Sequence, residues 1–125
     1  MTTIKSYTDI EQSRKLAEIL PIESADMYWF RDDTETPKIY PKNMMKNSVS
    51  VTLPCWSLTA LFGVLPMIRK CKDIANPFIA KTPDNEYYVV HATLTEEVDS
   101  SAIYDNPVDA CVEMIERLYE ESNVL

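Results

Sequence analysis

The sequence FIAKTPDNEYYVVHATL, at residues 78–94, decides the fold class. Two runs of strand-forming residues, 78–81 and 86–94, flank the tetrapeptide Thr82-Pro83-Asp84-Asn85. Proline presets the backbone for a turn, and Asp and Asn side chains bond to a turn's own backbone. Strand-forming runs on both sides of such a turn predict an antiparallel β-hairpin.

More strands are expected towards the N-terminus. An aromatic run at residues 27–31 precedes a polar stretch ending at Pro37 and a second run at residues 38–40, which predicts another hairpin. Residues 49–53 alternate strictly between apolar and polar side chains, and this period of two predicts a further strand. Together these segments predict a largely antiparallel sheet of four or five strands.

Two helices are predicted by their start signals. Thr8 and Glu11 form a capping box, so a first helix is expected to begin at Thr8 and to end at Pro21. Asn106 is suited to be an N-cap and Pro107 to the first helical position, which predicts a last helix. Its apolar positions recur at helical spacing, and we expect them to be buried: Val108, Cys111, Met114, Ile115 and Leu118.

A third helix is expected over residues 56–65, with Ser57 as its N-cap and Pro66 at its end. It is apolar on nearly every side, which predicts burial. It also contains Gly63, the single glycine of the chain, and we interpret this residue as a point of close packing. One glycine excludes P-loops, dinucleotide fingerprints and nucleophile elbows, all of which need several.

These elements predict an α+β fold in a single globular domain over residues 1–125. Strand alternation places Tyr28 and Trp29 on opposite faces, and likewise Tyr87 and Tyr88. Both faces of the sheet are therefore expected to be covered at least in part. The three helices pack against the sheet, and an α/β/α sandwich is one way to arrange them.

The composition limits the compartment and the chemistry. No apolar run is long enough to cross a membrane, and no apolar N-terminal segment marks secretion, so we expect a cytoplasmic protein. Cys55, Cys71 and Cys111 form neither a C-x-x-C pair nor a disulfide framework, which predicts reduced thiols. With His91 as the only histidine, a zinc site with two histidines is excluded, and we expect no metal and no cofactor.

The formal charge of -8 is distributed unevenly. Residues 94–125 hold nine acids and a single base, whereas residues 36–81 hold seven bases and one acid. Four carboxylates share one face of the last helix at i, i+4, i+7 and i+11: Asp109, Glu113, Glu116 and Glu120. This acidic stripe is a solvated face, the binding surface for a basic protein partner, or a contact with the basic middle, either of the same molecule or of a second copy. The net charge argues against broad nucleic-acid binding, although the basic middle leaves a local exception open.

Two residues could carry chemistry. Cys71 lies among three cations, which favours the thiolate, but no catalytic partner is evident for it. His91 lies in a predicted strand, where a hydrogen-bonded structural histidine is the better interpretation. No catalytic residue is assigned. A small enzyme or ligand-binding protein with a pocket near His91 or Cys71 is the alternative to a non-enzymatic interaction protein.

A resemblance spans most of the chain. Residues 9–13, 16–21, 25–29, 54–58 and 105–111 resemble a family of small uncharacterised proteins of Bacteroides-type gut bacteria and their phages and integrated elements. The start of the last helix is also similar to the closing motif of phage proteins with an α/β/α sandwich. The resemblance implies a cytoplasmic mobile-element protein and a helix-covered sheet, and no activity. Because the net charge is concentrated in residues 94–125, we expect a non-enzymatic interaction protein of a phage or mobile element, whose contact surface is the acidic last helix with residues 96–105.

Overall fold

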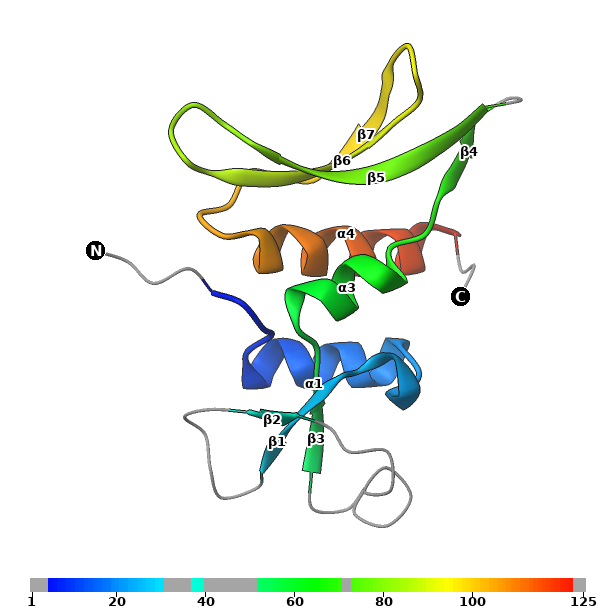
Figure 1. Cartoon of the computed structure of the whole chain (residues 1–125). Helices are drawn as coiled ribbons and strands as arrows, with labels where there is room; N and C mark the ends of the chain where they lie inside the picture. The colour runs from blue at the N-terminus through cyan, green and yellow to red at the C-terminus, as the bar shows by residue number, and fades with distance from the viewer. Residues whose placement is uncertain (1–4, 31–36, 40–51, 71–72, 123–125) are drawn as a thin grey trace.

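The structure is a computed structural model that describes residues 5–30, 37–39, 52–70 and 73–122 (Figure 1). Its helices are α1 (Ile10–Ile19), the 3₁₀ helix η1 (Ile22–Ser24), α3 (Leu58–Val64) and α4 (Pro107–Ser122). Its strands are β1 (Met27–Phe30), β2 (Lys38–Ile39), β3 (Thr52–Cys55), β4 (Ile68–Lys70), β5 (Asp73–Lys81), β6 (Tyr87–Ala92) and β7 (Glu97–Ser100).

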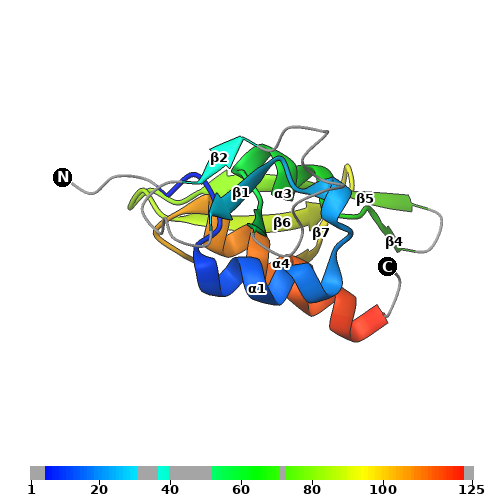
Figure 2. The same ribbon diagram turned by 90° about the horizontal axis from the view of Figure 1, so that it is seen from below.

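The α+β class and the antiparallel pairing are confirmed, but the prediction of one sheet is wrong. The strands form two sheets, one of order β2-β1-β3 and one of order β4-β5-β6-β7, in which short β4 extends the edge of β5. Figure 1 shows the α-helices between the two sheets. The α/β/α sandwich is not confirmed, because the described helices lie on only one face of the β4–β7 sheet (Figures 1 and 2).

The hairpin at residues 78–94 forms as predicted. Strands β5 and β6 pair from Lys81 with Tyr87 to Asn76 with Ala92, and β5 begins earlier than expected, at Asp73. In the turn, the Asn85 N–H donates to the Thr82 carbonyl at 3.0 Å. Asn85 has a φ of 62°, a left-handed conformation that asparagine tolerates better than most residues.

The N-terminal hairpin is confirmed in its strands. Met27 of β1 pairs with Ile39 of β2, while the predicted turn at residues 31–36 lies outside the described part of the chain. The third predicted strand is β3, which pairs with β1 and continues past the expected end at Leu53. Pro54 is tolerated there because β3 is an edge strand, where a missing N–H costs no ladder bond. Of the expected strand at 49–53, residues 49–51 are not described.

Helix α1 begins one residue later than predicted. Its N-cap is Asp9, which accepts from the Gln12 N–H at 2.7 Å, and Gln12 Oε1 accepts in return from the Asp9 N–H at 3.1 Å. Thr8 is fully buried instead. Its hydroxyl lies 2.8 Å from Ser13 Oγ and accepts from the Trp56 N–H at 3.1 Å. Through these hydrogen bonds, Thr8 connects the start of α1 to the end of β3.

Helix α3 has the predicted N-cap, because Ser57 Oγ accepts from the Ala60 N–H at 3.2 Å. The prediction of burial on all sides is wrong: Phe62 is 39% exposed and Gly63 is exposed. A Cβ on Gly63 would meet nothing within 4 Å. The interpretation of Gly63 as a close-packing residue is therefore wrong as well, since the helix turns one side, with Leu61, to the core.

Gly63→Ala is expected to raise the free energy of unfolding by about 0.5–1 kcal/mol. Alanine restricts the unfolded chain and favours the helix, and its methyl group has open space at this position. Urea denaturation followed by circular dichroism measures the change. The reverse replacement in the same helix, Ala60→Gly, is expected to destabilise; a destabilised Gly63→Ala protein would contradict the described environment of Gly63.

Helix α4 supplies the centre of the core. Asn106 Oδ1 accepts from the Asp109 N–H at 2.9 Å, which confirms the predicted N-cap. The predicted stripe is buried throughout: Val108, Cys111, Met114 and Ile115 at 0% exposed and Leu118 at 8%. One connected cluster joins this stripe to Leu16 of α1, Leu61 of α3 and Val89 of β6. Since its apolar side is buried, α4 has only its acidic side left to face outward.

Candidate functional site

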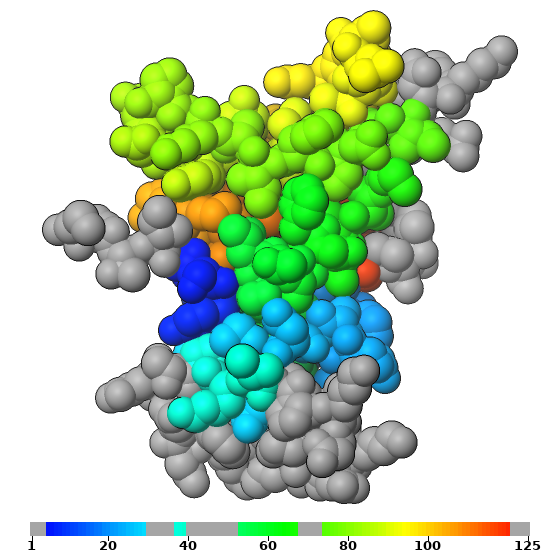
Figure 3. All heavy atoms as spheres, in the orientation of Figure 1, coloured from blue at the N-terminus to red at the C-terminus, as the bar shows by residue number. Residues whose placement is uncertain are grey.

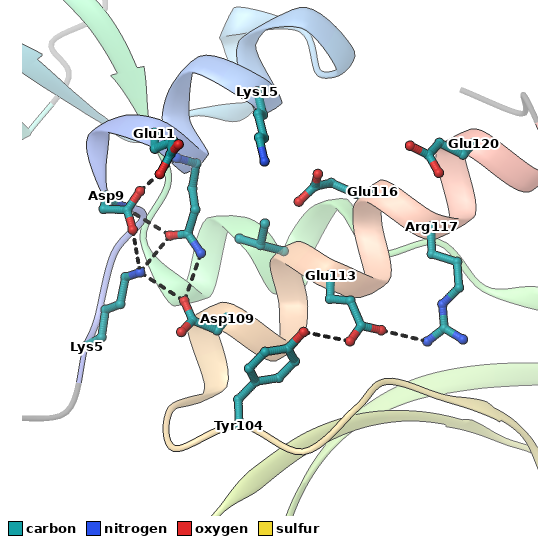
Figure 4. A pocket seen from close by; sticks show the side chains of 12 residues that line it. Lys5, Asp9, Glu11, Lys15, Tyr104, Asp109, Glu113, Glu116, Arg117 and Glu120 are labelled. Carbon is teal, nitrogen blue, oxygen red and sulfur yellow. Dashed lines mark hydrogen bonds and ion pairs between the residues drawn. The ribbon is translucent and has the colours of Figure 1, made fainter.

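Helices α1 and α4 lie side by side (Figure 2), and the acidic side of α4 lines a cleft of about 530 Å³ between them (Figure 4). Six carboxylates and three cations line this α1–α4 cleft, together with Gln12, Tyr104 and Val112. The carboxylates are Asp9, Glu11, Asp109, Glu113, Glu116 and Glu120, and the cations are Lys5, Lys15 and Arg117. All four residues of the predicted acidic stripe are thus brought together in one place.

One end of the cleft is closed by Lys5. Its ammonium group donates to Asp109 Oδ1 at 2.9 Å, to Asp9 Oδ2 at 3.0 Å and to Gln12 Oε1 at 2.7 Å. Gln12 Nε2 also donates to Asp109 Oδ1, at 2.8 Å, and Asn106 Nδ2 donates to its other oxygen at 2.9 Å. Asp109 therefore joins the N-terminal segment, α1 and the start of α4, and is already engaged within the fold.

The pKa values of this pair shift in opposite directions. Burial by itself would raise the pKa of Asp109, but the hydrogen bonds from Lys5, Asn106 and Gln12 outweigh it and lower the pKa below 3.8. Burial would likewise lower the pKa of Lys5, and the hydrogen bonds to Asp109 and Asp9 raise it instead. Both shifts mean that the charged forms stabilise the folded state.

Asp109→Asn is expected to lower the free energy of unfolding by about 1.5–3 kcal/mol, the usual contribution of hydrogen bonds to a charged group. Because the folded pKa of Asp109 is depressed, this contribution is complete above 3.8 and is lost as the pH falls through the folded pKa. Urea denaturation at a series of pH values should therefore show the two proteins converging in acid. A difference in the free energy of unfolding that stays constant with pH would contradict this role of the Asp109 charge. Asp84→Asn, in an exposed turn, serves as the control.

Glu113 is held at the middle of the cleft. Its Oε1 accepts from the Tyr104 hydroxyl at 2.7 Å and from the Ala102 N–H at 3.1 Å, and its Oε2 accepts from Arg117 Nη2 at 3.0 Å. The hydrogen bond to Glu113, helped by burial and by the negative charge of Glu113, raises the pKa of Tyr104 to about 12. Glu113 thus ties the chain before α4 to the helix itself.

Arg117 connects α4 to β7 through a hydrogen bond and an ion pair. Its Nη2 donates to the Ser100 carbonyl at 2.7 Å, and its Nη1 lies 3.3 Å from Asp99 Oδ1. Arg117 pairs with Glu113 but, across the described chain, with no other member of the acidic stripe.

Glu116 and Glu120 form the open part of the cleft (Figure 4). Lys15 of α1 lies near this part, whereas Glu11 lies next to Asp9 at the other end of the cleft (Figure 4). Among the described residues, none of these four side chains has a hydrogen-bond or ion-pair partner. The acidic stripe therefore divides into two structural carboxylates, Asp109 and Glu113, and two open ones.

Sequence reasoning missed the residues that make this division. Lys5 lies 104 positions from Asp109 in the chain, and no local signal connects them. Gln12 could have been found as the third residue after Asp9 in a capping box, but its bond to α4 could not. For Tyr104, nothing in the pattern pointed to Glu113.

The other candidate residues lie elsewhere. His91 is fully buried, its Nε2 lies 2.8 Å from the Pro66 carbonyl oxygen, and it does not line the cleft. This confirms its interpretation as a hydrogen-bonded structural histidine. Cys71 lies outside the described residues. Cys55 and Cys111 are free and buried, and burial raises the pKa of Cys111 to about 12, so its thiolate is disfavoured.

Within the described ranges, no group of three or more His, Cys, Asp or Glu side chains could hold a metal ion. No described helix is long and apolar enough to span a membrane. No protein-family model matches the chain, and neither a curated protein nor a solved structure matches it.

Proposed function

We propose that the chain is a non-enzymatic interaction module whose α1–α4 cleft binds a basic segment of a partner protein. The observation that carries this proposal is the pair Glu116 and Glu120, two carboxylates on adjoining turns of α4 that line a cleft without a partner in the described chain. Glu11 of α1 lines the same cleft, at the end next to Asp9 (Figure 4).

The charge of the cleft favours a cation. Lys5 is already bonded to Asp9 and Asp109, and Arg117 to Asp99 and Glu113, so these two cations contribute little attraction for an anion. Of the three cations, Lys15 alone has no partner in the described chain, and it lies near the two open carboxylates, Glu116 and Glu120 (Figure 4). The open part of the cleft is therefore net negative, and a Lys or Arg side chain entering it would form ion pairs that fix orientation and speed association.

The dimensions of the cleft support a peptide segment. Its volume of about 530 Å³ is within the range of protein ligand sites. It runs between two helices, so an extended or helical segment could place successive basic side chains along it. The context we propose, a bacterial cytoplasm and a phage or integrated element, rests on the sequence resemblance to small proteins of Bacteroides-type bacteria and their phages.

Fluorescence anisotropy with a labelled oligolysine peptide tests the proposal. The wild-type chain is expected to bind the peptide, with an affinity that falls as added salt screens the charges. The same peptide with acetylated lysines lacks the positive charge and is expected not to bind. Equal binding of the two peptides, or no binding of either at low salt, would refute a basic partner.

A further inference from the structure

The closed end of the α1–α4 cleft surrounds one ammonium group with a full set of acceptors (Figure 4). Lys5 Nζ donates to Asp109 Oδ1 at 2.9 Å, to Asp9 Oδ2 at 3.0 Å and to Gln12 Oε1 at 2.7 Å. A lysine ammonium group has three N–H donors and no acceptor. Each donor therefore has one acceptor, and the three acceptors come from the N-cap of α1, from α1 itself and from α4.

These acceptors are held in place by hydrogen bonds that do not involve Lys5. Asp9 Oδ1 accepts from the Gln12 N–H at 2.7 Å, and Gln12 Oε1 accepts from the Asp9 N–H at 3.1 Å. Asp109 accepts from the side-chain amides of Gln12 at 2.8 Å and of Asn106 at 2.9 Å. The acceptors are thus preorganised, and a preorganised site loses little conformational entropy when it binds a ligand.

The geometry fits a lysine better than an arginine. A guanidinium group is a planar fork that fits the two oxygens of one carboxylate. Here each carboxylate directs one oxygen to the ammonium group, while the other oxygen of Asp109 accepts from Asn106 and the other oxygen of Asp9 accepts from Gln12. Neither carboxylate offers both oxygens, so the site matches three donors on a single nitrogen.

The side chain of Lys5 can leave this site without detaching the N-terminal segment, residues 5–8. The backbone of this segment is bonded at Ser6, whose carbonyl accepts from the Leu58 N–H at 3.0 Å, and at Thr8, whose N–H donates to the Trp56 carbonyl at 2.9 Å. The Lys5 side chain is 26% exposed. In Figure 3 the first described residues (dark blue) lie at the surface beside the start of α4 (orange). The site is therefore within reach of a ligand from solvent.

We propose that this end of the cleft is a binding site for one primary ammonium group, which Lys5 fills in the free chain and a lysine of the basic partner fills in the complex. The exchange with a partner rests on the proposed function, whereas the site itself does not. Three carboxylates, Asp9, Glu11 and Asp109, line this end against the single positive charge of Lys5. The surplus of negative charge attracts a second cation, which then replaces the first.

Chemical rescue of Lys5→Ala tests the site without a peptide. The replacement removes the side chain beyond Cβ, which n-propylammonium replaces atom for atom. We expect Lys5→Ala to unfold at a lower urea concentration than the wild type, and added n-propylammonium chloride to raise this midpoint more in Lys5→Ala than in the wild type. Tetramethylammonium chloride at equal concentration is the control, because it has the same charge and no N–H donor. Equal effects of the two salts, or of n-propylammonium on the two proteins, would overturn the site.

Lys5→Arg tests the preference for a primary ammonium group. This variant keeps the positive charge and is expected to remain folded, with a urea midpoint below that of the wild type, because a guanidinium group cannot place three donors at the position of Nζ. A midpoint equal to that of the wild type would overturn the preference.

Anisotropy titrations with oligolysine test the exchange. Lys5→Ala is expected to bind the peptide at least about threefold more tightly than the wild type, because the peptide no longer displaces Lys5. Lys38→Ala is the matched control, since it removes the same charge from an exposed position on β2 that does not line the cleft. An equal gain in the two variants would overturn the exchange. Rescue by n-propylammonium with no binding of oligolysine by any of the proteins would overturn the proposed function and the exchange, and would leave the ammonium site supported.

Discussion

Trp56→Ala is expected to lower the free energy of unfolding by about 3–5 kcal/mol, the usual cost of removing a buried aromatic side chain. Trp56 is fully buried, and its indole Nε1 donates to Ser24 Oγ at 2.9 Å. Its backbone and Thr8 also exchange hydrogen bonds, at 2.9 Å and 3.1 Å. Trp56 therefore lies where β3, η1 and the start of α1 meet, and a cavity at this position weakens the packing of all three elements. Urea denaturation followed by circular dichroism measures the loss.

The other tryptophan provides the control. Trp29 is 5% exposed, but its Nε1 is buried without a hydrogen-bond partner among the described residues. Trp29→Phe therefore removes an unsatisfied donor and breaks no described hydrogen bond. Trp56→Phe, in contrast, removes the hydrogen bond to Ser24. We expect Trp56→Phe to be the more destabilising of the two. The reverse order would contradict the hydrogen bond from Trp56 to Ser24.

The variant Glu116→Lys/Glu120→Lys is expected to weaken oligolysine binding by at least about tenfold, which corresponds to about 1.4 kcal/mol. The two replacements exchange the open carboxylates of the cleft for cations that repel the peptide. They are expected to leave the fold intact, because neither glutamate has a partner in the described part of the chain. Replacing Asp109 or Glu113 would not be a clean test, because both are bonded to the fold.

Asp84→Lys/Glu86→Lys is the matched control for net charge. Both residues are exposed in the turn of the β5–β6 hairpin, and neither lines the cleft. The two double variants change the total charge equally, so equal weakening would mean that the peptide responds to the charge of the whole molecule. Anisotropy titrations in the same buffer compare them directly.

Local sequence signals predicted the elements well. The turn at residues 82–85 and the Asn106-Pro107 pair act through bonds within a few residues of the chain, and both formed as expected. The error at the start of α1 has a clear cause. Thr8 and Asp9 are both good caps, and contact with Trp56, far away in the sequence, selects Asp9 by burying Thr8.

The arrangement of the elements was not predictable from these signals. The alternation of apolar and polar side chains shows which residues of a strand share a face, but it does not show to which sheet the strand belongs. For this reason the sequence predicted one sheet where the structure has two. The site was predictable in part. Helical spacing placed Asp109, Glu113, Glu116 and Glu120 on one face, but the contacts of Lys5 and Tyr104 decide which of them are open.

Mapping of backbone amide chemical shifts during an oligolysine titration tests the central claim most directly. If the α1–α4 cleft is the binding site, the largest shifts are expected at residues 11–15 of α1 and 112–120 of α4, with little change in the β5–β6 hairpin. Shifts of equal size at Asp84, Glu86 and the other exposed acids would contradict a specific site, because the peptide would then follow the negative charge over the whole surface.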